Sequence, residues 1–189
     1  MENAAAFEWH LRLAVRALRA GGLVVHATEG VWGLACDPFC RDAVASVLAV
    51  KQRRLEKGLI VIGADAADFA PELSLLSEAA AAEITATWPG SVTWLVASER
   101  FPQWITGGRP KVAVRVPGHE QARRLSRAFG GPIVSTSANL AGRPAAKNRF
   151  QAAAFASRES AVSYLLPGET LPTRSQPSQI RDLDGQVHR

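Results

Sequence analysis

Short apolar runs alternate with amphipathic helical patterns along most of this chain, and this alternation limits its fold more than any other feature. The runs that we predict to be strands are 23–26, 59–62, 92–97, 112–116, 133–134 and 162–166. The segments with helical spacing of apolar residues are 7–19, 41–52, 77–87, 121–129 and 148–156. Strands interleaved with helices predict an α/β fold, a twisted sheet flanked by helices. Because two of the strands look hairpin-linked, we expect a mostly mixed sheet.

The size and make-up of the chain favour one domain. Its 189 residues are 47% hydrophobic, which is enough for a single large core, so we predict one domain over residues 1–189. No window approaches the roughly 20 apolar residues of a membrane span. The start, Met1-Glu2-Asn3, is unlike a secretory signal, and two cysteines are too few for a disulfide framework. We therefore expect a cytoplasmic protein without membrane attachment.

The charge is unevenly distributed. Residues 1–99 hold 8 Lys/Arg against 12 Asp/Glu and residues 100–189 hold 14 against 5, so the halves carry −4 and +9. A basic half indicates a polyanionic partner such as nucleotide phosphates or RNA, although an Arg-rich solvated face explains the same numbers. Metal chemistry has less support. Cys36 and Cys40 have no second Cys/His pair, and the four histidines are scattered, so we expect no protein metal site.

Polar side chains follow several predicted strands. Thr28 and Glu29 leave the strand 23–26 at its carboxyl end, where ligands bind in open α/β sheets; alternatively, Thr28 caps a turn and Glu29 is solvated. The run Ser135–Asn139 is small and hydrogen-bonding, which favours a ligand contact over a simple cap. Arg115 alternates with apolar neighbours in its strand. If it is buried it needs an anion, which a ligand carboxylate would supply; otherwise it lies on an exposed sheet face.

Cations cluster at the end of the helical segment 41–52. Lys51 and Arg53 do not share a helix face, but they converge if the helix ends near Lys51, and Lys57 lies close by in the sequence. The simpler interpretation is that these cations cap the negative end of the helix dipole. The chain has neither a Walker A loop nor a G-x-G-x-x-G fingerprint, so an ATP site here must have another design.

Six blocks, in order, resemble those of the YrdC/TsaC family. Residues 27–34, Ala-Thr-Glu-Gly-Val-Trp-Gly-Leu, are similar to its P-T-E-x-x-Y/F-G-L signature, and residues 51–60 are similar to its K-x-R-x-x-x-K-x-L-I segment. Residues 88–93 resemble W-P-G-P-x-T, and residues 177–180 resemble P-S-x-I. The other two matching blocks are 112–117 and 135–139. One block alone would be weak support, but six in family order cover nearly the whole chain.

The resemblance implies a YrdC-like α/β fold with a concave, basic face. It also implies an activity, L-threonylcarbamoyladenylate synthase, a nucleotidyltransferase that makes threonylcarbamoyl-AMP and pyrophosphate from L-threonine, bicarbonate and ATP. A separate tRNA threonylcarbamoyl transferase complex then uses the product on the adenosine beside the anticodon of ANN-decoding tRNAs. Mg²⁺ is expected to accompany ATP, held by phosphates and water.

The same resemblance implies roles for individual residues. The catalytic cations are Lys51 and Arg53, which meet the triphosphate. The other implied ATP contacts are Ser137, Asn139 and Ser178. The implied threonine contacts are Thr28, Ser135 and Arg115, with Arg115 on the carboxylate. Ala27, Arg54 and Ser91 stand where the family usually has proline, which leaves loop rigidity and affinity open.

Three other functions remain open. The strongest is a double-stranded-RNA-binding or ribosome maturation factor that uses the basic face. A carbamoyl-phosphate-handling domain of hydrogenase maturation shares the fold but usually lies in a much longer chain. A nucleotide-binding regulator is a weaker third candidate.

Overall fold

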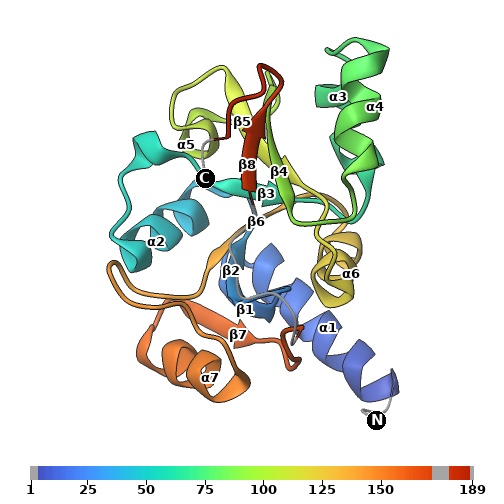
Figure 1. Ribbon diagram of the computed structural model, residues 1–189. Coiled ribbons are helices and arrows are strands. Elements are labelled where there is room, and N and C mark those ends of the chain that lie inside the picture. The colour runs from blue at the N-terminus through green and yellow to red at the C-terminus, as the bar shows by residue number, and fades with distance from the viewer. Residues whose placement is uncertain (1–3, 172–178, 188–189) are drawn as a thin grey trace.

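One mixed sheet of eight strands organises the computed structural model, which describes residues 4–171 and 179–187 (Figure 1). The strands are β1 (Leu23–Ala27), β2 (Trp32–Cys36), β3 (Ile60–Ile62), β4 (Val92–Ala97), β5 (Lys111–Arg115), β6 (Ile133–Ser137), β7 (Val162–Leu165) and β8 (Gln179–Asp182). Their order across the sheet is β7-β1-β2-β6-β3-β5-β4-β8. The β1–β2, β2–β6, β3–β6 and β4–β5 pairs are antiparallel, and the β1–β7, β3–β5 and β4–β8 pairs are parallel. The predicted mixed α/β sheet is confirmed.

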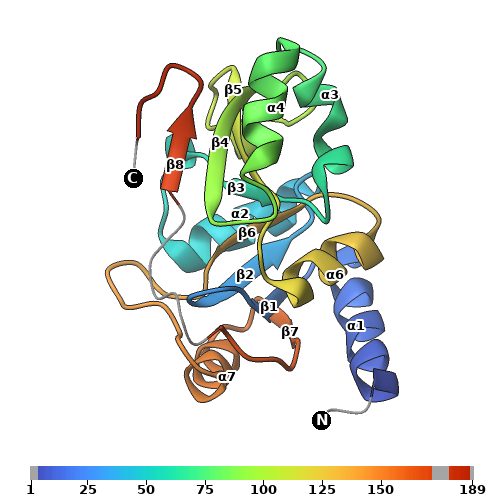
Figure 2. The same ribbon diagram turned by 45° about the vertical axis from the view of Figure 1, so that its right-hand side comes forward.

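Helices cover this sheet on both faces. They are α1 (Ala4–Arg19), α2 (Arg41–Lys51), α3 (Ala70–Leu73), α4 (Glu78–Ala86), α5 (Gln103–Thr106), α6 (Glu120–Phe129) and α7 (Arg149–Arg158), with short 3-10 turns at Leu55–Lys57 and Ala66–Phe69. Figures 1 and 2 show α1 and α6 side by side next to β1, with α2 on the opposite side of the sheet. The five long predicted helices are all present, within three residues at each end.

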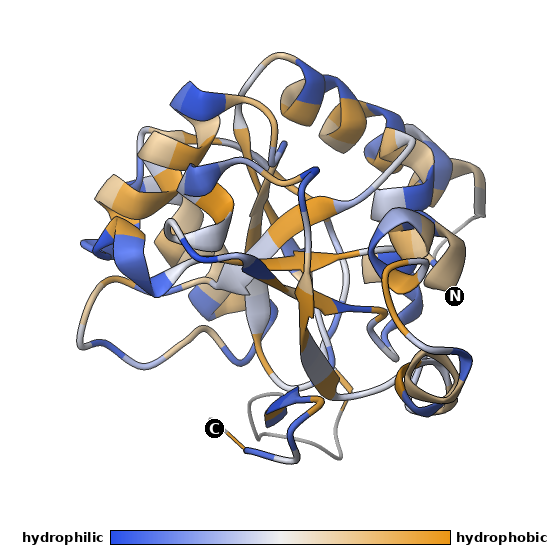
Figure 3. Cartoon of the chain, turned by 90° about the horizontal axis from the view of Figure 1, so that it is seen from above, coloured by the Kyte–Doolittle hydropathy of each residue, from blue (hydrophilic) through white to orange (hydrophobic). Residues whose placement is uncertain are grey.

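Alternate strand residues build two cores. Val24, Ala35 and Ile133 pack with α1 and α6, whereas their neighbours Val25 and Leu34 pack with the buried residues of α2. This is the period of two expected for strands covered on both faces. Figure 3 shows largely hydrophobic strands at the centre and hydrophilic residues on the surrounding helices and loops. In the described part of the chain, no helix is both long and apolar enough to cross a membrane.

Three strand assignments differ from the sequence-based prediction. β2 and β8 were not predicted, and the strand predicted at 133–134 continues to Ser137, so the prediction that Ser135–Ser137 only follow the strand was wrong. The sequence of β2, Trp-Gly-Leu-Ala-Cys, has no β-branched residue, and Ser135 and Ser137 lack apolar character, so local propensity was low. Pairing between β2 and β6, from Gly33↔Ser137 to Cys36↔Val134, overrides it.

Candidate active site

A cavity of about 720 Å³ opens on one face of the sheet. Its lining includes alternate residues of β3 and β5 and the consecutive residues 135–137 of β6, together with the loop after β1 and the end of α2. The described site residues predicted from the sequence all line it: Thr28, Lys51, Arg53, Arg115, Ser135, Ser137 and Asn139. Ser178 lies outside the described residues. The lining holds six Lys or Arg side chains and two carboxylates, which matches the expected concave basic face.

Lys51 joins the early and late parts of the site directly. Its Nζ donates to the Ser137 carbonyl at 2.7 Å and to Ser137 Oγ at 3.1 Å, and it also bonds Asn139 Oδ1. Lys51 therefore does not cap α2, whose C-cap is Gln52 in the left-handed conformation. Burial, and next the charge of Arg53, lower the pKa of Lys51 to about 8. The ammonium is thus held in a low-dielectric position where an anionic ligand would favour its charged form.

Arg53 reaches the same cavity but also closes a turn. Its Nε donates to the Gly58 carbonyl at 3.1 Å, and its Nη2 donates to the carbonyls of Gly58 and Lys57 at 2.9 and 3.2 Å. These bonds hold the 3-10 turn Leu55–Lys57 against the end of α2. Arg53 therefore lines the cavity and also stabilises the neighbouring turn.

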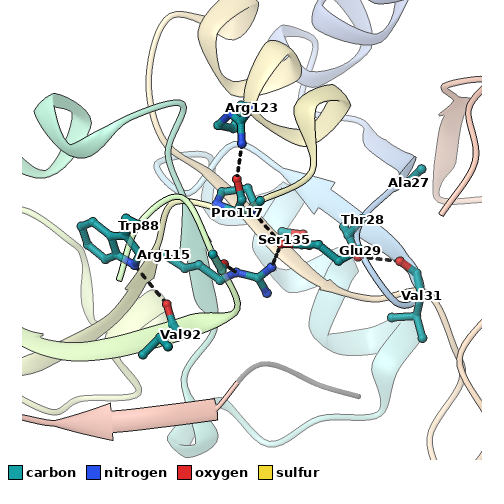
Figure 4. Close-up of polar contacts among 12 residues, drawn as sticks. Ala27, Thr28, Glu29, Val31, Trp88, Val92, Arg115, Pro117, Arg123 and Ser135 are labelled. Carbon is teal, nitrogen blue, oxygen red and sulfur yellow. Dashed lines mark hydrogen bonds and ion pairs between the residues drawn. The ribbon is translucent and has the colours of Figure 1, made fainter. Parts of the chain in front are cut away.

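Arg115 has an anionic partner within the protein. Its guanidinium forms an ion pair with Glu29, and its Nε donates to the Gly90 carbonyl at 2.8 Å (Figure 4). Both side chains of the pair are largely buried, with 13% and 12% exposed. The alternative of a solvated Glu29 is therefore wrong, and so is that of an exposed face at Arg115. The prediction that a buried Arg115 needs an anion is confirmed, but Glu29 supplies that anion.

Glu29 is held in its charged form. Burial works to raise its pKa, but the charge of Arg115, the hydrogen bond from Arg115 and those from backbone amides together outweigh burial and lower the pKa. One of these amides is Gly118 N, which donates to Glu29 Oε1 at 2.7 Å. Glu29 thereby ties the loop after β1 to the loop after β5 across the cavity.

Thr28 and Ser135 line the same cavity as Arg115, and each side-chain hydroxyl has a partner within the protein. Thr28 Oγ1 donates to the Val31 carbonyl at 2.5 Å, so it closes the turn, as the simpler alternative required, and lines the cavity as well (Figure 4). Ser135 Oγ lies 3.1 Å from Nε2 of His26, a fully buried residue of β1. His26 was not among the predicted site residues; its place inside an apolar strand was the available signal.

Ala27 and Arg54, which stand where the family usually has proline, each make a specific contact. The Ala27 amide, which a proline would lack, donates to Gln121 Oε1 at 3.0 Å, while Gln121 Nε2 donates to the Pro167 carbonyl. Arg54 is exposed, pairs with Glu56 at 3.4 Å and does not line the cavity. Two cations that were not predicted, Arg109 and Lys111, do line it.

The structure combines a mixed α/β sheet with a basic cavity lined by strand residues, Lys51 and Arg115, an arrangement suited to small anionic ligands. The sequence model of the Sua5/YciO/YrdC family, described as "Telomere recombination", matches residues 16–189. The chain belongs to this family.

Similar proteins agree with this assignment. A "Threonylcarbamoyl-AMP synthase" of Cellvibrio japonicus is 48% identical over 179 residues, covering 93% of each chain. A protein of the same name from Pseudomonas aeruginosa is 45% identical over 178 residues, covering 93% of this chain and 94% of its own. The crystal structure of P. abyssi Sua5 complexed with L-threonine superposes with a TM-score of 0.87 at 30% identity. It matches 96% of this chain, which spans 54% of that longer protein.

Proposed function

We propose that this protein is an L-threonylcarbamoyladenylate synthase. The observation that carries the proposal is that Lys51 and the Ser137–Asn139 segment meet in the same cavity as Arg115. Such a cavity suits a triphosphate at one end and an amino acid carboxylate at the other. The relatives named threonylcarbamoyl-AMP synthase and the threonine complex of Sua5 support the same choice.

Threonine would bind at the Arg115 end. The Arg115 guanidinium can hold a carboxylate, since it has donors beyond those used on Glu29 and Gly90. Glu29 keeps this guanidinium in place, and Thr28 and Ser135 line the same cavity. We assign Thr28, Ser135 and Arg115 to threonine.

ATP would bind at the Lys51 end. The three N–H groups of Lys51 are matched by three oxygens of Ser137 and Asn139, so the ammonium is fixed at this end of the cavity and would act on a phosphate through its charge. We assign the triphosphate to Lys51 and Arg53 and further nucleotide contacts to Ser137 and Asn139. Ser178 belongs to the same proposal.

The reaction requires positioning and charge stabilisation more than a protein nucleophile. The threonine amine attacks the carbon of CO₂ and releases a proton, or attacks the carbon of bicarbonate and the amine hydrogen leaves with a bicarbonate oxygen as water; either route gives a carbamate. A carbamate oxygen then attacks the α-phosphorus of ATP, the bond to the β-phosphate oxygen breaks, and pyrophosphate leaves. Lys51 and Arg53 would offset the charge on the phosphates as it moves to the leaving group. This makes the enzyme a nucleotidyltransferase.

Mg²⁺ is proposed as a companion of ATP. The carboxylates of the cavity, Glu29 and Asp182, already accept hydrogen bonds from the protein. Among the described residues, no three His, Cys, Asp or Glu side chains gather as metal ligands. Phosphate oxygens and water are the ligands that Mg²⁺ usually keeps in such sites. The product would pass to a tRNA threonylcarbamoyl transferase complex, and we place this work in the cytoplasm.

One assay tests the proposal. The protein is incubated with ATP, L-threonine and bicarbonate, and pyrophosphate and the AMP ester are measured while each component is left out in turn. Pyrophosphate release that requires all three supports the synthase. Salt-sensitive binding of double-stranded RNA with no pyrophosphate release would instead favour the RNA-binding alternative, for which the basic cavity is the available argument.

A further inference from the structure

His26 does not line the cavity, but its imidazole contacts Ser135, which does. Its side chain is fully buried in β1, with Nδ1 3.1 Å from the Ala27 carbonyl oxygen and Nε2 3.1 Å from Ser135 Oγ. Nothing in the proposed reaction uses this imidazole. Its two contacts nevertheless determine which atom of the Ser135 hydroxyl is left for a ligand.

The imidazole is neutral and only one arrangement of its proton satisfies both contacts. Burial, and next the charge of His119, lower the pKa of His26 to about 4. The Ala27 carbonyl can only accept, so Nδ1 carries the hydrogen and Nε2 is an acceptor. Ser135 must then donate its hydroxyl hydrogen to Nε2. A serine hydroxyl has one hydrogen, so toward the cavity Ser135 offers lone pairs alone.

A glycine makes this contact possible. Gly33 of β2 lies between β1 and β6, opposite His26 and Ser137 in the strand register. A Cβ at Gly33 would lie 2.8 Å from His26 Nε2, 3.0 Å from Ser135 Oγ and 3.2 Å from Thr28 Cγ2. The missing side chain is therefore the space through which His26 reaches Ser135 across the intervening strand.

The Thr28 hydroxyl also lies at the cavity and, like that of Ser135, donates its hydrogen to a partner within the protein. Its hydroxyl hydrogen goes to the Val31 carbonyl, so it too offers lone pairs to the cavity (Figure 4). We propose that His26 is a positioning residue that orients the Ser135 hydroxyl, so that Ser135 and Thr28 accept hydrogen bonds from the amino group of an amino acid whose carboxylate binds Arg115. This rests on the proposed function and assigns the recognition of the amine.

The test compares L-threonine with 3-hydroxybutanoate, which lacks the amine, by calorimetry on the whole protein. His26→Phe keeps an aromatic ring and removes the acceptor, so the Kd for L-threonine should rise about tenfold or more. The Kd for 3-hydroxybutanoate should change less than about threefold. His26→Gln, whose side-chain oxygen reaches the place of Nε2, should restore most of the affinity. In turnover assays KM for threonine should rise while KM for ATP stays the same.

His10→Phe is the matched control, because His10 bonds Tyr164 Oη away from the cavity. If His26→Phe lost affinity equally for both ligands, or lost no affinity for L-threonine, the inference would be overturned while the proposed function stayed intact. Wild-type protein that binds no L-threonine would instead overturn the proposed function. The tautomer of His26 can also be measured directly in the wild-type protein. At neutral pH, ¹⁵N NMR should show the Nδ1–H tautomer. An Nε2–H tautomer or an imidazolium would refute the inference.

Discussion

Lys51 Nζ lies 2.7 Å from the carbonyl oxygen of Ser137, although 86 residues separate the two in the chain. With Ser137 Oγ and Asn139 Oδ1, this carbonyl surrounds the ammonium with oxygens from the end of β6. The end of α2 and the end of β6 are thereby fixed to one another. A phosphate that binds here meets a cation whose position is already set, which lowers the entropy lost on binding.

Replacing Lys51 should affect turnover strongly. Lys51→Ala removes the cation assigned to the triphosphate, and we expect threonine-dependent pyrophosphate release to fall about 10²-fold or more. Arg54→Ala is the matched control, since Arg54 is exposed, pairs with Glu56 and does not line the cavity; its turnover should stay within about twofold. Near-normal formation of the AMP ester by Lys51→Ala would contradict the assignment.

The lowered pKa of Lys51 predicts a pH dependence of nucleotide binding. Because that pKa is about 8, the ammonium loses its proton as pH rises through this value, and the attraction for phosphate is lost with it. The Kd for ATP should therefore increase between about pH 7 and about pH 9.5. Arginine keeps its charge over this range. Calorimetric titrations of Lys51→Arg should accordingly show a flat profile, and a wild-type profile just as flat would count against a lowered pKa.

Arg53 should not be replaceable by lysine. Lysine keeps the charge but cannot donate in the same fork to the carbonyls of Lys57 and Gly58. We expect Arg53→Lys to exchange amide hydrogens faster over residues 55–58 and to lose turnover, and Arg53→Ala to lose about 10²-fold. Mass spectrometry of hydrogen exchange checks the first effect. Unchanged exchange in Arg53→Lys would mean that the fork is not needed to hold this turn.

The Glu29–Arg115 pair should stabilise the fold above acidic pH. The pKa of Glu29 is lowered in the folded state, so its contribution is present above the ordinary glutamate pKa and is lost as pH falls through the folded value. Glu29→Gln should cost about 3 kcal/mol at neutral pH, at the low end for buried pairs because some exposure remains. Urea unfolding should show this difference shrinking in acid. Exposed Glu56→Gln is the control, and an equal loss in both variants would refute a special role for the pair.

Proline at position 27 should destabilise this protein, even though the family usually has it there. Ala27→Pro removes the amide that donates to Gln121, leaving a buried acceptor short of one hydrogen bond, at a cost of about 1–3 kcal/mol. In a Gln121→Leu background the same change removes a donor that is already unpaired, so its cost should fall. Thermal or urea unfolding of the four proteins gives the coupling. Equal costs in both backgrounds would show that ring sterics, and not the lost bond, cause the effect.

Much of the secondary structure could be read from local patterns. Helices such as α1 and α6 have strong amphipathic spacing and clear glycine stops, and strands such as β4 and β5 have β-branched runs, so short-range signals suffice. β2 and the second half of β6 were missed because their residues are small or polar. They are strands because they pair with each other, which no local window contains.

The site residues likewise fall into those that the sequence predicted and those whose role depends on the tertiary structure. The sequence pointed to Lys51, Arg53, Arg115 and the Ser135–Asn139 run, because clustered cations and small polar groups marked these positions and the resemblance to the family blocks implied their roles. Only the tertiary structure decided that Glu29 is the partner of Arg115, that Arg54 faces solvent and that His26 stands behind Ser135. The physical reason is that local periodicity specifies which face of an element is apolar. The partner of a buried charge, or the direction of a hydroxyl hydrogen, depends instead on which strands become neighbours.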